Sequence, residues 1–146
     1  MSSGFVHLHT HSSYSPMWGI PTLEALCQAA HTQGQDRLAL TDTNGLYGAI
    51  RFLEVAKHEG LKPILGAELV HKAHRAVLLA KTPAGYANLC RLLSARHEES
   101  TFDFIAAVAR YRAGLIILSD DLSALRTWRK DSPKDVYVEL TPGSDI

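Results

Sequence analysis

The chain has 146 residues, of which 46% are hydrophobic and 21% charged, a composition typical of one ordinary globular domain. Fifteen Lys and Arg residues balance fifteen Asp and Glu residues. This balance argues against an autonomous nucleic-acid-binding module, because no net positive field draws the chain to phosphates. The sequence starts without an apolar signal core and has no apolar run of bilayer length, so we expect a cytoplasmic location and no membrane partner.

The first half of the chain alternates short apolar runs with segments of helical period. A strand is expected at residues 5–9, and a helix capped by Thr22 and ended by Gly34 follows it. A second strand at 38–40 precedes a helix from about Tyr47 to Glu59, which Gly60 ends. A third strand is centred on Ile64 and Leu65 and runs toward Glu68.

The second half continues the alternation. A fourth strand is expected at 76–80, and Thr82-Pro83 then caps and opens a helix with Leu89 and Leu93 inward. A helix near 102–110, a strand at 115–118, a short helix at 122–129 and a sixth strand at 136–140 follow. The cysteines, Cys27 and Cys90, fall in helical stretches, where we expect small buried residues rather than a disulfide or metal pair.

This order of elements predicts an α/β fold with right-handed crossovers and a largely parallel sheet. The sequence has neither a dinucleotide-binding fingerprint nor a Walker A motif. Six strands with their helices fit a βα-barrel that has not closed, since closed barrels usually need about 200 residues or more. We therefore expect residues 1–146 to be the N-terminal part of one barrel domain and a fragment of a longer chain.

Polar side chains gather where the expected strands end, which is where the chemistry of a βα-barrel lies. They are His9 and His11, Asp42, Glu68, Asp120 and Asp121, and Glu139. His7, His9 and His11 share one side of the first segment if it stays extended, as joint metal ligation requires. A hydrolytic site of this kind uses two or three cations to activate water and hold a phosphate. In the alternative interpretation the carboxylates only cap the following helices and the histidines are hydrogen-bonded core residues.

Four segments resemble a known family: HLHTHSSYS at 7–15, TDTNGLYGA at 41–49, GLKPILGAE at 60–68 and GYANL at 85–89. The sequence is similar to the PHP (polymerase and histidinol phosphatase) family, and within it to the PHP domain that opens the alpha subunit of bacterial DNA polymerase III and its error-prone relatives. The resemblance implies a distorted (βα)7-type barrel, here incomplete. It also implies partners, namely the remaining domains of a DNA polymerase, with DNA contacted only indirectly through that parent protein.

The resemblance implies a metal site as well. The HxH pair of active members falls on His9 and His11, and their glutamate on Glu68. A further histidine falls on Arg75, or on His74 if one residue is inserted, and a later ligand falls near Asp121. We therefore expect the metal ligands to be His9, His11, Glu68, His74 and Asp121, and the catalytic residues to be Asp42 and His7.

Three positions depart from the family pattern. Trp18 stands where an acidic ligand is expected, Thr43 stands for the histidine of Thr-Asp-His, and the position of a late histidine falls near Gly143. We therefore expect one zinc or manganese ion rather than three, with a metal-free site as the alternative. The expected role is a scaffold domain in a polymerase of DNA replication or repair synthesis. The alternative is a metal-dependent phosphoesterase, either a proofreading 3′–5′ exonuclease or a small-molecule phosphatase.

Overall fold

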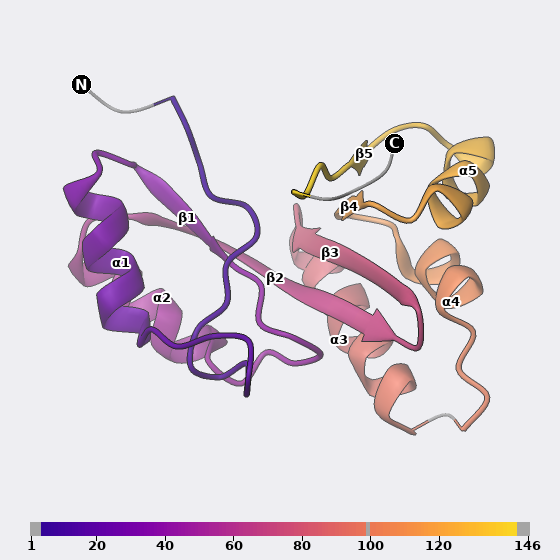
Figure 1. The fold of residues 1–146 in the computed structure, drawn as a ribbon, viewed down its shortest axis with the longest axis horizontal. Coiled ribbons are helices and arrows are strands. Elements are labelled where there is room, and N and C mark those ends of the chain that lie inside the picture. The colour runs from indigo at the N-terminus through magenta and orange to yellow at the C-terminus, as the bar shows by residue number, and fades with distance from the viewer. Residues whose placement is uncertain (1–3, 99, 143–146) are drawn as a thin grey trace. The chain divides into compact units, whose positions relative to one another are not determined.

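The computed structural model describes residues 4–98 and 100–142, in which five helices and five strands are found (Figure 1). The strands follow the hydrogen-bonded order β1-β2-β3-β4-β5. The chain divides into two compact units, with the boundary between Glu68 and Leu69. The α/β class is confirmed, whereas the barrel is not. No helix of the described ranges has the length and apolar character needed to cross a membrane.

The first unit holds α1 (Leu23–Thr32), β1 (Arg37–Leu40), α2 (Ala49–His58) and the start of β2 (Lys62–His71). The Thr22 side chain accepts a hydrogen bond from the Ala25 amide and so begins α1, as predicted. Gly60 follows α2 with φ +72, a left-handed conformation that glycine adopts without strain. β1 and β2 pair in parallel, from Arg37 opposite Lys62 to Leu40 opposite Leu65.

The core of the first unit lies between its two helices and β1. The stripe of α1 that contains Leu23 and Cys27 packs with Leu38 and Leu40 of β1 and with Phe52 of α2. All five side chains are buried. At roughly 1.5–3 kcal/mol for each fully buried large apolar side chain, this burial is the main term that holds the unit together.

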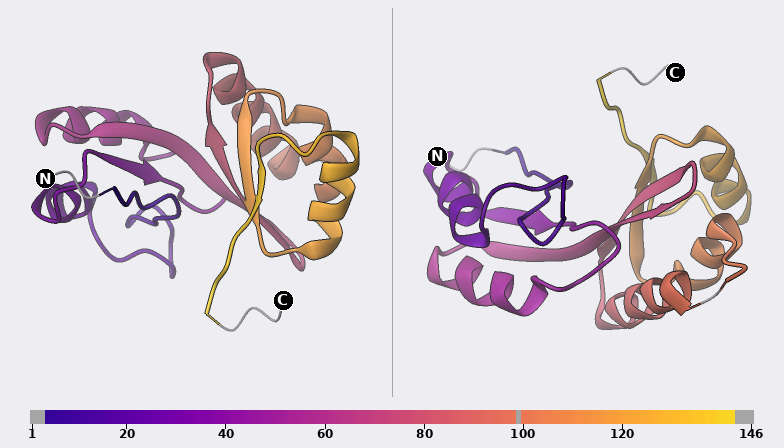
Figure 2. Two further views of the ribbon diagram at one scale, coloured as in Figure 1. Left: turned by 90° about the horizontal axis from the view of Figure 1, so that it is seen from above. Right: turned by 60° about the horizontal axis from the view of Figure 1, so that its bottom comes forward.

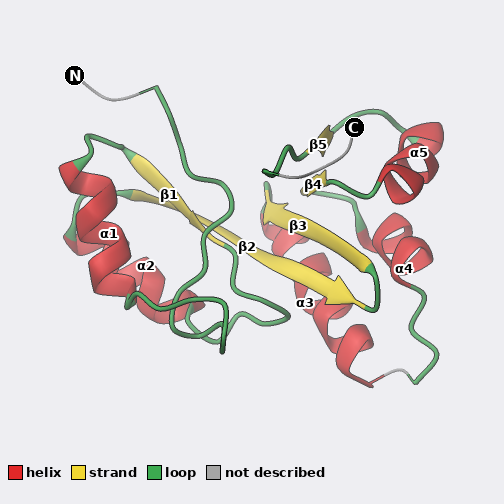
Figure 3. Ribbon diagram, in the orientation of Figure 1, coloured by secondary structure: helices red, strands yellow, loops and turns green. Residues whose placement is uncertain are grey.

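The strand predicted at residues 5–9 is wrong, because this segment is irregular and Figure 3 draws it as a loop. It nevertheless runs beside β1, since the Ala39 amide donates to the His7 carbonyl and the Thr41 amide to the Thr10 carbonyl. From the first bond to the second, the chain moves two residues along β1, from Ala39 to Thr41, but three residues along the segment, from His7 to Thr10. The extra residue breaks the ladder and its alternation of side chains, as a β-bulge does.

The second unit begins with the end of β2 and contains β3 (His74–Ala80), α3 (Pro83–Glu98), α4 (Phe104–Tyr111), β4 (Leu115–Ser119), α5 (Leu122–Asp131) and β5 (Val136–Val138). The three helices cover one face of β3, β4 and β5 (Figure 2). Thr82 caps α3 as predicted, with its hydroxyl accepting from the Gly85 amide.

The prediction of a largely parallel sheet is wrong for β3. Only two residues separate His71 of β2 from His74 of β3, with Lys72 at φ +55, and a parallel crossover needs a dozen residues or more. β3 therefore reverses direction and pairs antiparallel with β4, from Val77 opposite Leu118 to Ala80 opposite Leu115. β4 and β5 are parallel.

Trp128 is the largest fully buried side chain of the second unit, and its ring lies 6.0 Å from that of Phe104. Its indole N–H donates to the Ile105 carbonyl at 3.0 Å, which satisfies the polar atom of this buried ring. Arg112 donates to the carbonyls of Trp128, Ser132 and Lys134 and so caps the end of α5.

The cysteines differ in their surroundings. Both are free; Cys27 is fully buried, as predicted, whereas Cys90 is half-buried. Burial, together with the nearby charges of Glu59 and Glu24, raises the pKa of the Cys27 thiol to about 11. Only about one Cys27 side chain in a thousand is then the reactive thiolate at pH 8.

We predict that a thiol reagent at pH 8 modifies Cys90 of the folded chain and spares Cys27, because Cys27 combines burial with a raised pKa. Peptide mass mapping after a timed reaction, with and without denaturant, measures both sites. Cys90→Ser is the control and leaves a folded chain that reacts only after unfolding. Equal labelling of the two cysteines in the native state would contradict the prediction.

Candidate metal centre

The segment that carries His9 and His11 is fixed to the end of β1 by the residue between them. The Thr10 amide donates to the Thr41 hydroxyl at 2.8 Å, and that hydroxyl donates to the Thr10 carbonyl at 3.0 Å. The Thr41 amide donates to the same carbonyl at 2.9 Å. Because Thr10 is held on both its backbone groups, the two flanking histidines occupy defined positions.

Asp42 holds the residues that follow His11. Its carboxylate accepts from the Ser12 amide at 2.7 Å, the Ser12 hydroxyl at 2.8 Å and the Ser15 hydroxyl at 2.6 Å. Asp42, Ser12 and Ser15 are all buried. The predicted catalytic residue Asp42 is thus surrounded by hydrogen-bond donors of its own chain.

Glu68 lies on β2 and faces both histidines. His9 Nε2 lies 3.4 Å from Glu68 Oε1, and His11 Nε2 lies 3.0 Å from Glu68 Oε2. The imidazole rings are 5.0 Å apart and nearly perpendicular. The Thr43 hydroxyl donates to Glu68 Oε2 at 2.9 Å, and backbone pairing between Thr43 and Glu68 places it there. Three of the five predicted metal ligands therefore converge within the first unit.

The charge of Glu68 is stabilised where it lies. Burial alone would raise the pKa of this carboxyl group, but contacts with His11, His9 and Thr43 outweigh that cost and hold the pKa well below its usual range. Glu68 is therefore an ionised carboxylate at neutral pH, which is the form that binds a cation.

The three side chains fit a metal ion by their donor chemistry and spacing. Two imidazole nitrogens and one carboxylate oxygen lie within 4.8 Å of one another, and no other group of three His, Cys, Asp or Glu in residues 4–98 and 100–142 does so. Ligand atoms around tetrahedral zinc lie about 3.3 Å apart, given bonds of about 2.0–2.1 Å. Three protein ligands with an open fourth position are typical of catalytic rather than structural zinc sites.

His7 lies apart from this cluster. It is exposed, its ring packs edge-on against Phe5 at 4.8 Å, and it lines a cavity of about 220 Å³ that Leu26 and Ala29 also line. The three histidines were expected to share one side only if the segment stayed extended, and this condition is not met. The extra residue in the segment between His7 and Thr10 explains the change of side.

The two departures from the family pattern in this unit have different outcomes. Thr43 replaces a ligating imidazole with a hydroxyl that binds Glu68, and sequence reasoning missed this contact. Trp18 is 73% exposed, in a loop closed by a hydrogen bond from the Ser13 amide to the Pro21 carbonyl. A side chain at Gly19 would collide with the Ser12 carbonyl oxygen, so this loop passes against the metal-binding segment.

In the second unit His74 and Asp121 contact each other, with His74 Nδ1 2.6 Å from Asp121 Oδ2. The other oxygen of Asp121 accepts from the Ser123 and Ala124 amides and begins α5. Burial raises the pKa of Asp121, but bonds from Ser123, His74 and Ala124 lower it to about 2. The metal role of this pair stays a prediction; its observed contacts are those of a helix cap.

Arg75 neutralises the other acidic groups at this edge of the second unit. Its guanidinium donates to Asp120 Oδ2 at 2.6 Å and lies 3.7 Å from Glu139 Oε2. The Ser119 hydroxyl donates to the Arg75 carbonyl, which fixes the start of β3 beside the end of β4. The position of the expected late histidine, Gly143, lies outside the described residues.

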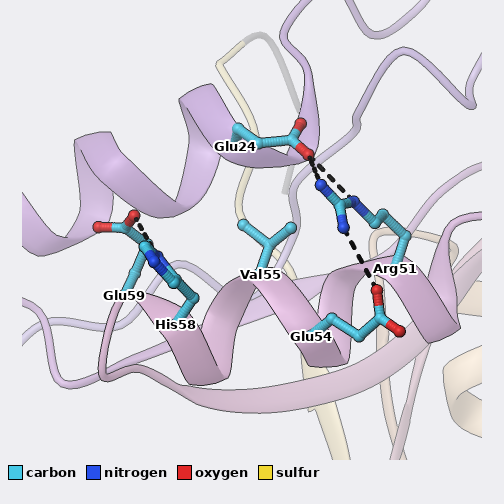
Figure 4. A pocket seen from close by; sticks show the side chains of 6 residues that line it. All are labelled: Glu24, Arg51, Glu54, Val55, His58 and Glu59. Carbon is cyan, nitrogen blue, oxygen red and sulfur yellow. Dashed lines mark hydrogen bonds and ion pairs between the residues drawn. The ribbon is translucent and has the colours of Figure 1, made fainter.

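A second cavity lined by residues of the first unit is an open groove of about 420 Å³ over α1 and α2 (Figure 4). Figure 4 shows Arg51 between Glu24 and Glu54, and His58 beside Glu59. The ionic groups that line it are largely satisfied by one another, which is typical of a solvated helix surface.

Comparisons with known proteins show the family of the chain. The sequence matches the PHP domain family over residues 7–139, and the chain belongs to that family. It is 47% identical to an error-prone DNA polymerase of Symbiobacterium thermophilum over 94 residues, 64% of this chain and 9% of that protein. It is 35% identical to the DNA polymerase III subunit alpha of Treponema pallidum over 140 residues, 82% of this chain and 12% of that protein.

The chain therefore spans about a tenth of the length of these two relatives. A solved structure from Bifidobacterium adolescentis, assigned as a metal-dependent phosphoesterase, has the same fold: the TM-score is 0.61, with 12% identity over 95% of this chain and 78% of that chain. The family resemblance stated from the motifs is confirmed.

We predict that Arg75→Met lowers the free energy of unfolding by about 1–3 kcal/mol, because it removes the cation that lies beside two half-buried carboxylates, Asp120 and Glu139. Lys81→Met is the control, since the more exposed Lys81 pairs with a single carboxylate, Asp135, and its loss should cost at most about 1 kcal/mol. Urea titrations followed by circular dichroism measure both. Equal losses in the two variants would show that the Arg75 cluster has no special weight.

Proposed function

We propose that this chain is the PHP domain of a DNA polymerase III alpha-type protein, that it holds a single zinc ion on His9, His11 and Glu68, and that it works mainly as a scaffold. The observation that carries the proposal is the makeup of the first unit's site. Three ligand atoms lie within 4.8 Å of one another, while the expected further ligand positions in this unit hold Trp18 and Thr43.

The donor set supports zinc and a single ion. Imidazole nitrogens suit zinc, whereas manganese prefers sites built from carboxylates, carbonyls and water. A multi-metal site needs bridging ligands that hold cations close together against their mutual repulsion. Trp18 cannot ligate, and Thr43 contributes a hydroxyl that is committed to Glu68. Both changes remove donor atoms that a second ion requires.

The residues of the site divide the work. A bound zinc ion supplies Lewis acidity and lowers the pKa of coordinated water. His9 and His11 present Nε2 atoms, and Glu68 supplies the charge that offsets the cation. Asp42 does not lie open to a substrate, because it is 2% exposed and binds Ser12 and Ser15. Position 18 holds a tryptophan where an acidic ligand was expected, and Asp42 is not available as a base. The site therefore supports metal binding better than catalytic turnover.

The second candidate function is a metal-dependent phosphoesterase, acting as a proofreading 3′–5′ exonuclease or a small phosphatase. The number of ligands favours it, because catalytic zinc sites typically have three protein ligands and hold water in the fourth position. The names of the relatives favour the polymerase setting. The phosphoesterase structure from Bifidobacterium adolescentis shares the fold at 12% identity, which supports a likeness of fold alone.

We predict one zinc ion per chain when the wild-type protein is purified without chelator and measured by elemental mass spectrometry, because one set of three ligands is present. The double change His9→Ala with His11→Ala should reduce the zinc content to near zero. The matched control changes His31 and His58 to Ala, two exposed histidines of the same unit, and should keep the metal.

The same preparations decide between the two functions. The scaffold proposal expects no chelator-sensitive release of phosphate from p-nitrophenyl phosphate or of nucleotides from single-stranded DNA. Robust hydrolysis that disappears with His9→Ala and His11→Ala would establish the phosphoesterase instead. Two or three ions per chain would contradict the single-ion site, and no metal in the wild type would contradict the metal site itself.

A further inference from the structure

A continuous line of hydrogen bonds connects the two sides of the metal centre through Asp42. On one side, Asp42 accepts from the amide and hydroxyl of Ser12, the residue next to His11. On the other side, it accepts from the Ser15 hydroxyl at 2.6 Å. The same Ser15 oxygen accepts from the Thr43 amide at 2.9 Å, and the Thr43 hydroxyl donates to Glu68 Oε2 at 2.9 Å.

The line is protected from water for most of its length. Ser12 and Ser15 are fully buried, Asp42 is 2% exposed and Glu68 is 4% exposed. Hydrogen bonds in such surroundings are electrostatically stronger than in water, and a missing partner costs more. A change at one member is therefore transmitted to the others instead of being absorbed by solvent.

Each end of the line acts on a metal ligand. At Glu68 the Thr43 hydroxyl occupies one lone pair of Oε2 and so fixes the plane of the carboxylate, whose two oxygens face His9 and His11. At the other end Asp42 holds Ser12, so the backbone that carries His11 cannot shift away from Glu68. Residues that orient ligands in this way typically change metal affinity 10–100-fold when they are altered.

Asp42 is badly placed for direct chemistry. Oδ1 accepts two hydrogen bonds and Oδ2 accepts one, all from Ser12 and Ser15. A general base must reach the proton that it removes, and this side chain is almost completely covered.

We propose that Asp42 is a positioning residue, which sets His11 through Ser12 and sets Glu68 through Ser15 and Thr43. The inference rests on the proposed metal site and goes beyond it by assigning the affinity of that site to four residues that do not touch the ion: Ser12, Ser15, Asp42 and Thr43. It replaces the catalytic role that the sequence predicted for Asp42.

The test uses Co²⁺ as the probe, because its visible absorption reports both binding and coordination geometry. The metal-free 146-residue chain is titrated with Co²⁺, and Thr43→Val is compared with Thr43→Ser. Valine has the shape of threonine without the hydroxyl, so we expect affinity to fall about 10-fold or more and the spectrum to change. Serine keeps the hydroxyl, and its affinity should stay within about threefold of wild type.

Ser15→Ala and Asp42→Asn test the rest of the line. Ser15→Ala removes the link between Asp42 and Thr43 and should weaken Co²⁺ binding about as much as Thr43→Val. Asp42→Asn turns an amide N–H toward donors that need an acceptor. It should lower the affinity for Co²⁺ by about 100-fold, the upper end of the 10–100-fold range. Thr32→Val removes a hydroxyl bonded to Gln28 on the exposed side of α1 and is the control with unchanged affinity.

The outcomes separate the inference from the metal site on which it rests. If wild type binds Co²⁺ and Thr43→Val, Ser15→Ala and Thr32→Val all bind equally well, the positioning role is wrong and the metal site stands. If wild type binds no Co²⁺, both are wrong. If Asp42→Asn does not fold, the Thr43 and Ser15 variants still test the positioning role. Their melting temperatures are measured alongside to show that they are folded.

Discussion

The geometry of the site depends on one constraint, the attachment of residues 9–15 to the end of β1. His9 and His11 lie on an irregular segment that has no ladder of its own, and side chains of such a segment hold a metal only when the backbone is fixed. Thr41 fixes the residue between the histidines, and Asp42 fixes those after them. Thr41 and Asp42 come directly after β1. Packing of this strand in the core therefore fixes the two residues that hold the histidine segment.

Local signals allowed the helices and their ends to be predicted. Thr22, Gly60 and Thr82 act as the sequence suggests because a cap depends on residues within one turn of it. The strand at 5–9 and the direction of β3 depend on pairing with distant residues. One extra residue before Thr10 and a two-residue turn after His71 decided them, and neither has a signal in composition or period.

The site residues divide in the same way. His9, His11 and Glu68 could be named from the sequence because the segments that carry them resemble those of the PHP family, and the structure brings the three side chains together. Carboxylates at strand ends are ambiguous, since the same residue types bind metal, cap helices and hold loops. Asp121 begins a helix and Asp42 holds a loop, and only the positions of Ser123 and of Ser12 distinguish these roles. For the role of Asp42, the available signal in the sequence was the small polar residues that directly follow the HxH pair.

The surroundings of Glu68 supply this buried carboxylate with partners from the chain itself. An ionised carboxylate that is buried without partners costs several kcal/mol, which would tie folding of the unit to metal binding. Here Thr43, His9 and His11 supply those partners from within the chain and keep the pKa of Glu68 low. The replacement of a ligating histidine by threonine therefore removes a donor to the metal and adds a donor to the protein. Pairing of this carboxylate within the chain is compatible with the scaffold role proposed for the domain.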